Sequence, residues 1–123
     1  MRFAPIVAIA ALIAPVPAFA HPKLVSATPA ANASVGSIRS VQLVFSEALV
    51  AKFSSATVVM TGMPGMANHA PMRVAGSVAL AKDGKTVTIT FAQPLVKGTY
   101  QVSYRVVSAD THVVEGKYQF TVK

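Results

Sequence analysis

Short runs of alternating apolar and polar residues, separated by turn-forming residues, constrain the fold of this chain more than any other feature. The clearest run is Thr86–Phe91, where three apolar residues fall on one face and three threonines on the other. The preceding Lys82-Asp-Gly-Lys85 is typical of a hairpin turn and joins this run to a strand expected over Val74–Leu80. Further strands are expected over residues 23–26, 41–45, 56–60, 100–106 and 117–122.

These runs predict an all-β fold with about seven strands. Short strands with frequent turns are typical of an antiparallel β-sandwich or barrel of ~100 residues. No window carries the apolar stripe of a helix, and we expect at most a single helical turn, over Glu47–Lys52. The pattern does not determine how the strands are connected.

The N-terminal residues predict a secretory signal peptide. A short basic start is followed by an apolar run over Ile6–Ala14 and by the small-x-small cleavage pattern Ala18-Phe-Ala20. The alternative, a membrane anchor, needs about 20 apolar residues, and three prolines interrupt this stretch. We therefore expect residues 1–20 to be removed. One exported domain over residues 21–123 would remain, which begins at His21 and does not insert into a membrane.

Charge and cysteine content narrow the classes of function. The formal net charge is +7, from 11 basic and 4 acidic residues. The basic residues are scattered and do not interleave with aromatic residues, so a solvated surface is favoured over contact with nucleic acid. The chain has no cysteine, which excludes a disulfide framework and a thiolate metal site and suits an oxidising compartment.

All methionines except Met1 lie in one segment of 13 residues. Glycine and proline within this segment argue against a helix, so we expect a loop whose side chains gather at one point. Uncharged thioether sulfur is a soft ligand that prefers Cu(I). Gap-filling in the core is the usual alternative role of methionine. The sequence predicts a Cu(I) site formed by two to four methionines together with a histidine, drawn from Met60, Met63, Met66, His69 and Met72.

A second set of candidate ligands comes from three separate places in the sequence. Cleavage after residue 20 would give His21 a free α-amine beside its imidazole, and these two groups can chelate one ion. Asp110 and His112 are two residues apart and in an extended backbone point to the same side. An ordinary hydrogen-bonded loop pair is the alternative for these two residues. Glu47 is either a further ligand or an ordinary surface acid. An amine, two imidazoles and a carboxylate suit Cu(II).

In their order along the chain, these features resemble the periplasmic copper-resistance protein CopC family. The resemblance covers nearly the whole of residues 21–123. It rests on the following segments: His21-Pro22 after the leader, Leu43-Val-Phe-Ser-Glu47, the methionine segment Met60–Met72, Val106-Val-Ser-Ala-Asp-Thr-His112, and Gly116-Lys-Tyr-Gln-Phe-Thr-Val122.

The resemblance implies a Greek-key β-sandwich or barrel of immunoglobulin-like type. It also implies a Cu(II) site at His21, Asp110 and His112, with Glu47 added in some members, and a separate Cu(I) site in the methionine segment. The function implied is a periplasmic copper carrier or buffer in copper resistance or uptake, without enzymatic activity. Its implied partners are copper ions and either a membrane copper importer or another periplasmic copper protein.

Two other functions stay open on the sequence. A terminal histidine paired with a second histidine resembles the copper centre of oxidative polysaccharide enzymes, although Asp110 would fill the position that oxygen needs and the chain has no tryptophan to bind sugar. A metal-free interaction sandwich is the other alternative, and it predicts no stabilisation by copper.

Overall fold

The protein is described by a computed structural model that covers residues 22–66 and 69–123. The expected signal peptide, residues 1–20, and the candidate ligand His21 lie outside the described residues. The described part contains nine strands and one 3-10 turn, with no α-helix. The all-β class expected from the sequence is confirmed, with nine strands in place of about seven.

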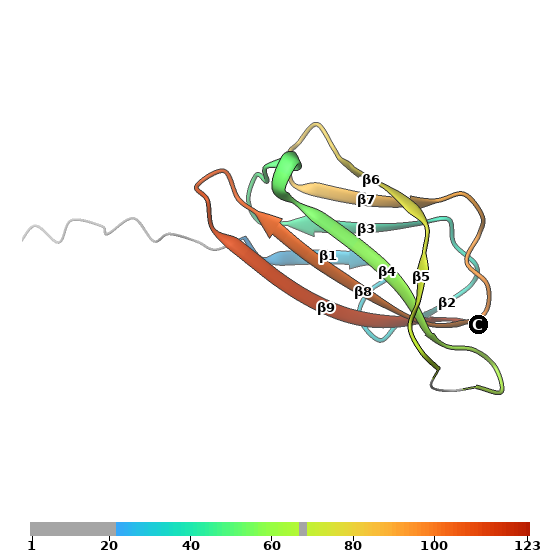
Figure 1. Cartoon of the computed structure of the whole chain (residues 1–123). Coiled ribbons are helices and arrows are strands. Elements are labelled where there is room, and N and C mark those ends of the chain that lie inside the picture. The colour runs from blue at the N-terminus through green and yellow to red at the C-terminus, as the bar shows by residue number, and fades with distance from the viewer. Residues whose placement is uncertain (1–21, 67–68) are drawn as a thin grey trace, which may run out of the picture.

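The strands form two sheets that pack face to face (Figure 1). The first sheet has the order β1 (Leu24–Thr28), β3 (Ser40–Phe45), β7 (Thr86–Phe91), β6 (Gly76–Leu80). The second has the order β2 (Ser34–Val35), β9 (Val113–Val122), β8 (Gly98–Val107), β4 (Ser55–Gly62), β5 (Met72–Val74).

The strands are connected as a Greek key. Every strand pair is antiparallel except β2 with β9, which is parallel. Consecutive strands β3 and β4 lie in different sheets, as do β7 and β8, yet β3 pairs with β7 and β4 with β8. These interlocked crossings are the Greek-key connection of a sandwich.

The structure corrects three expectations about individual elements. The strand expected over Val74–Leu80 is two strands, because the chain leaves the second sheet after β5 and enters the first at β6. Gly76 permits this change, since a Cβ there would lie 3.0 Å from the side chain of Ile89 and 3.1 Å from the backbone of Thr90. The two-residue strand β2 was not expected, and the helical turn η1 covers Ala51–Phe53 instead of residues 47–52.

The core lies between the inner faces of the two sheets, where the apolar residues of the alternating runs point. Aromatic rings fill much of it. Phe45 meets Tyr104 edge-on at 5.3 Å between ring centroids, and Tyr100 stacks on Phe120 at 5.5 Å. Offset and edge-on contacts of this kind are the favoured arrangements of aromatic pairs. The alternation read from the sequence therefore identified the core-facing side of these strands correctly.

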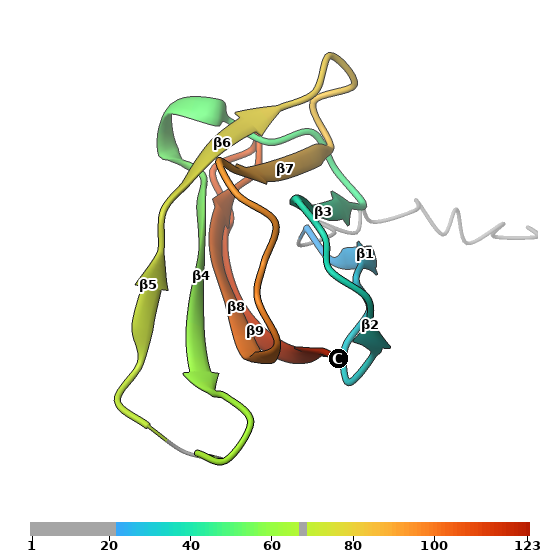
Figure 2. The ribbon, with the colours of Figure 1, turned by 90° about the vertical axis from the view of Figure 1, so that its right-hand side faces the viewer.

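The sandwich has two ends that carry different candidate ligands. At one end, the β8–β9 turn lies beside residues 46–49 and the β6–β7 hairpin, since Ala109 N–H donates to Ala48 O at 3.1 Å and Leu49 N–H donates to Gly84 O at 2.8 Å. We call this the His112 end. At the other, the β4–β5 hairpin extends beyond the sheets and carries the methionines (Figure 2). We call this the methionine end. Strand β8 has ten residues between the two, which is about 30 Å at ~3.3 Å per residue.

Candidate metal centres at the two ends of the sandwich

Asp110 and His112 meet at the His112 end. The carboxylate Oδ2 of Asp110 lies 3.0 Å from Nδ1 of His112, with both side chains partly exposed. The backbone between them is not extended as expected, because Thr111 has a positive φ of 74° and the segment turns tightly. The two side chains therefore come together through a turn. The sequence argument reached the correct juxtaposition from an incorrect local geometry.

Ser108 is hydrogen-bonded to both Asp110 and His112 in this turn. Its side chain is 1% exposed, and its hydroxyl donates to Oδ1 of Asp110. The same oxygen accepts the backbone N–H of His112 at 3.2 Å. The hydrogen bond from Ser108, followed by the contact with His112, keeps the pKa of Asp110 below its usual value even though partial desolvation acts in the opposite direction. A carboxylate that stays ionised is available as a metal ligand or as an acceptor for imidazole.

The first described residues of the chain run beside the segment that carries Glu47. Lys23 and Ser46 exchange two hydrogen bonds, from Ser46 N–H to Lys23 O at 2.8 Å and from Lys23 N–H to Ser46 Oγ at 2.9 Å. On the other side of the same segment, Ala48 accepts from the β8–β9 turn. Glu47 lies in the sequence between Ser46 and Ala48, the two residues that make these contacts, and it is half-buried.

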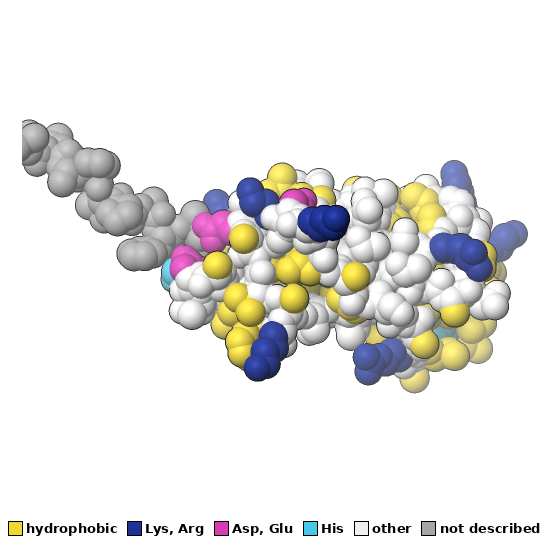
Figure 3. All heavy atoms as spheres, turned by 90° about the horizontal axis from the view of Figure 1, so that it is seen from above, with side chains coloured by type: hydrophobic (Ala, Val, Ile, Leu, Met, Phe, Trp, Pro, Cys, Tyr) yellow, Lys and Arg dark blue, Asp and Glu magenta, His cyan; other side chains and the backbone are white. Residues whose placement is uncertain are grey.

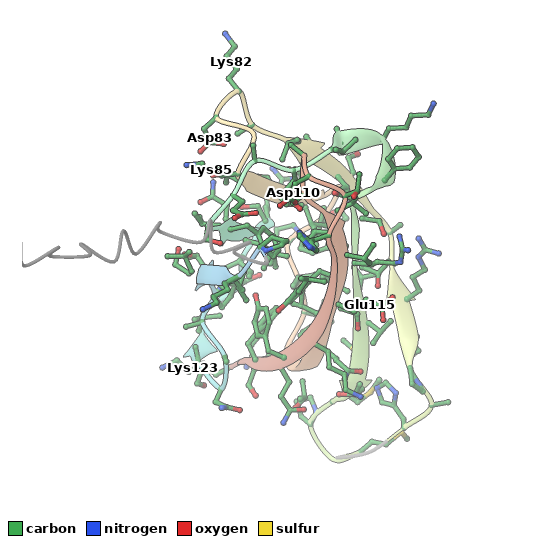
Figure 4. All side chains as sticks on the ribbon, turned by 90° about the vertical axis from the view of Figure 1, so that its left-hand side faces the viewer. Lys82, Asp83, Lys85, Asp110, Glu115 and Lys123 are labelled. Atoms are coloured by element: carbon green, nitrogen blue, oxygen red, sulfur yellow. The ribbon has the colours of Figure 1, made fainter. Side chains whose placement is uncertain are left out.

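Within residues 22–66 and 69–123, no three histidine, aspartate or glutamate side chains form a group that could hold a metal ion. Asp110 and His112 therefore present two donors, and the structure does not bring Glu47 into a metal-binding group with them. Figure 4 shows Asp110 at the opposite end of the domain from Lys123. Figure 3 shows the visible acidic side chains toward one end of the domain, beside a histidine, with apolar and basic side chains at both ends.

At the methionine end, the four sulfurs are divided between strands and loop. Met60 lies on β4 and Met72 on β5, where they are paired in register. Met63 and Met66 bond to each other across a Pro64-Gly65 turn through two backbone hydrogen bonds of 2.9 Å. The strand expected over residues 56–60 is confirmed at Met60. The expectation of a loop is correct for Met63 and Met66 but wrong for Met72, which begins a strand that the sequence pattern did not show.

Burial separates Met60 from the other three methionines. Met60 is 7% exposed and belongs to the core, whereas Met63, Met66 and Met72 are 37%, 52% and 55% exposed. Gap-filling in the core, the usual role of methionine, therefore describes Met60. The other three side chains are accessible at the surface of the hairpin.

His69 is hydrogen-bonded to strand β4. Its backbone N–H donates to Thr61 O at 3.0 Å, and its ring Nδ1 lies 2.7 Å from Ala70 O. The other ring nitrogen, Nε2, is shielded from solvent and has no hydrogen-bond partner among the described residues. Because Nδ1 faces a carbonyl oxygen, it carries the proton in neutral imidazole, which leaves Nε2 with a lone pair. Buried polar atoms without a partner are rare, and ion binding is one recognised reason for them.

Sequence reasoning did not assign a role to Ser108. The signal that could have identified it is the serine two residues before an aspartate in a turn, since hydroxyl groups commonly bond to neighbouring groups in such segments. Its burial depends on the packing of the strand ends and could not be read from the sequence.

Comparison with known proteins decides the family. Residues 24–123 match the CopC domain. The chain belongs to the CopC family. It is 50% identical over 106 residues to copper resistance protein C of Escherichia coli, which covers 86% of this chain and 84% of that protein.

Solved structures agree with this assignment. The CopC-family chain is similar to PcoC, a methionine-rich copper resistance protein from Escherichia coli, with a TM-score of 0.77 and 48% identity over 85% of this chain and 100% of that one. It is also similar to CopC from Methylosinus trichosporium OB3b, with a TM-score of 0.70 and 33% identity over 84% of this chain and 94% of that one. The described part of the chain contains no helix with the length and apolar character needed to cross a membrane.

Proposed function

We propose that this CopC-family protein is a periplasmic copper carrier or buffer that holds Cu(II) at the His112 end and Cu(I) at the methionine end. The observation that carries the proposal is the contact between Asp110 and His112, at the end of the sandwich where the described chain begins beside Ser46. Relatives named as copper resistance proteins support copper as the cargo.

The Cu(II) site of the proposal takes four donor groups from His21, Asp110 and His112, which lie in two segments of the chain. His21 supplies its α-amine and imidazole after the signal peptide is removed, and His112 supplies a second imidazole. Asp110 contributes a carboxylate, either on the metal or as the acceptor that orients His112. Glu47 is the additional carboxylate of the proposal, since its segment contacts both Lys23 and Ala109 through neighbouring residues. Nitrogen and oxygen donors of this kind suit Cu(II).

The Cu(I) site of the proposal uses the exposed thioethers Met63, Met66 and Met72 with His69. Neutral soft donors match the preference of Cu(I). The shielded Nε2 of His69, which lacks a partner among the described residues, is the nitrogen we assign to the ion. Met60 is the register partner of Met72, and its burial makes it the least suited of the four methionines to bind the ion directly.

In this proposal the donor sets suit a copper carrier better than a copper enzyme. If Asp110 binds the ion, it would occupy a position that an oxygen-activating copper centre would need to keep open. Thioether ligands would favour exchange of the ion. Delivery to a membrane copper importer or to another periplasmic copper protein, in copper resistance or in uptake, follows from the family resemblance.

The test compares Cu(II) electron paramagnetic resonance spectra of two forms of the protein. One form begins at His21, and the other carries one extra residue before it. The proposal predicts that the extended form loses the amine chelate and shows a changed spectrum with weaker binding. Identical spectra and affinities would exclude the terminal amine as a ligand.

A further inference from the structure

Ser108 is unusual among the polar residues of this domain. In the described part of the chain, it is the only serine, threonine, amide or charged residue that is buried, at 1% exposure. It lies directly after β8 and forms an isolated bridge with Leu49, so its backbone is fixed by the neighbouring segment. A buried hydroxyl is costly unless it is hydrogen-bonded, and its bonds therefore show what it does.

The hydroxyl of Ser108 connects the two candidate copper donors. It has one hydrogen to donate, and Oδ1 of Asp110 receives it. Its oxygen accepts the backbone N–H of His112 at 3.2 Å. The backbone of Ser108 adds two more bonds to the same turn, from Thr111 N–H to Ser108 O and from Ser108 N–H to His112 O, both 2.9 Å.

These bonds orient the Asp110 carboxylate. With Oδ1 held by Ser108, the second oxygen Oδ2 faces Nδ1 of His112 at 3.0 Å. The 3.0 Å contact does not have the geometry of a hydrogen bond. An ionised carboxylate nevertheless offers only lone pairs, so it favours the proton of neutral His112 on Nδ1, the ring nitrogen that faces it. The remaining ring nitrogen, Nε2, then has the lone pair that a metal ion requires.

We propose that Ser108 is a positioning residue that holds Asp110 so that His112 adopts the Nδ1–H tautomer and presents Nε2 before any metal arrives. The consequence for copper affinity rests on the Cu(II) site proposed above. The tautomer itself does not, because it is a property of the metal-free protein.

The test uses Ser108→Ala, which removes the hydroxyl and leaves the backbone bonds in place. Ser54→Ala is the matched control. The Ser54 hydroxyl accepts Val107 N–H at 3.0 Å and donates to Val107 O at 3.4 Å, so it pins the same end of β8 through Val107 and not through Asp110. Ser108→Cys tests packing separately, because a thiol fills nearly the same space and is only a weak donor.

The readout is the pair of ring ¹⁵N chemical shifts of His112 in the metal-free protein, at a pH where the imidazole is neutral. We expect the Nδ1–H tautomer in the native protein and in Ser54→Ala. We expect a shift toward Nε2–H in Ser108→Ala and Ser108→Cys, with Cu(II) affinity about tenfold lower, as for other residues that orient a metal ligand.

An unchanged tautomer in Ser108→Ala would overturn the proposal, and so would an equal change in Ser54→Ala. If Ser108→Ala changes the tautomer but the native protein binds no Cu(II), the positioning role holds and the proposed copper function fails. The two failures are therefore distinguishable.

Discussion

The two ends of the sandwich differ in how far the fold arranges their candidate donors. At the His112 end, Asp110 and His112 already touch, and a buried serine holds them. At the methionine end, three sulfurs are exposed on a protruding hairpin and one is buried in the core. The fold thus holds the donors of the His112 end by hydrogen bonds, whereas it leaves three sulfurs of the methionine end at the surface.

This contrast has a physical reason. Asp110 can be fixed in advance because its charge accepts hydrogen bonds from Ser108 and His112. Thioethers are weak acceptors and offer the fold little to hold them by. Packing can fix a methionine, as for Met60, but it also buries the sulfur. Surface methionines therefore keep their freedom until a soft ion organises them.

Replacement of His112 should have the largest effect and tests whether the two ends are independent. We expect His112→Ala to raise the Kd for Cu(II) about 100-fold, because the paired donors are lost. This corresponds to about 2.8 kcal/mol of binding free energy. Cu(I) affinity should stay unchanged, and competition titrations with chelators specific for each oxidation state measure both. A comparable loss of Cu(I) binding would show that the ends do not act separately.

The reciprocal variant changes Met63, Met66 and Met72 together to leucine. Leucine has nearly the same volume and no donor atom, so we expect Cu(I) affinity to fall about 100-fold while Cu(II) affinity is retained. Met60→Leu is the matched control, since its side chain is buried, and we expect less than about a threefold change. If Met60→Leu alone abolished Cu(I) binding, the division between buried and exposed sulfurs would be wrong.

Acid should separate the two ends further. Imidazole and amine ligands must release protons to bind metal, whereas thioethers are not titrated. We expect Cu(II) affinity to fall about tenfold per pH unit for each proton that competes, and Cu(I) affinity to fall much less. Chelator competition over a pH series checks this. Equal slopes for both ions would give His69, and not sulfur, the main role at the methionine end.

A smaller effect concerns stability without metal. Hydrogen bonds within the turn lower the pKa of Asp110, and bonds from Lys85 and Thr86 lower that of Asp83. A depressed pKa stabilises the fold above the unfolded value of about 3.9, and this contribution is lost as pH falls through the folded value. Asp110→Asn and Asp83→Asn should therefore lower Tm at neutral pH.

The Tm of each of these two variants should approach the Tm of the native protein as the pH falls below the folded pKa of the aspartate. Thermal melts at several pH values measure this. Only Asp110→Asn should also affect Cu(II). A difference in Tm that grew toward low pH would contradict the assigned direction of the two pKa shifts.

How much of this could be read from the sequence depends on the kind of contact. Alternation identified strands such as Thr86–Phe91 and their buried faces, because burial on one face of a strand repeats every two residues. It did not reveal that the chain changes sheets between β5 and β6, since both strands are largely exposed and lack a buried apolar face whose shift could mark the crossing.

For the candidate ligands too, the local sequence predicted part of the site and tertiary packing decided the rest. Residue type alone indicated which side chains suit copper. The contact of Asp110 with His112 depends on the positive φ of Thr111 and on the burial of Ser108, and both of these are set by tertiary packing. Proximity in the sequence grouped Met60 with the other methionines, but the register of β4 turns its side chain into the core.

Paramagnetic broadening of backbone amide signals by Cu(II) tests the separation of the two sites most directly. The measurement uses ¹⁵N-labelled protein that begins at His21. We expect substoichiometric Cu(II) to remove signals of residues 46–49 and 108–112 and to leave those of residues 60–72, about 30 Å away, intact. Loss of the methionine-end signals at the same Cu(II) concentration, with residues 108–112 unaffected, would contradict the account.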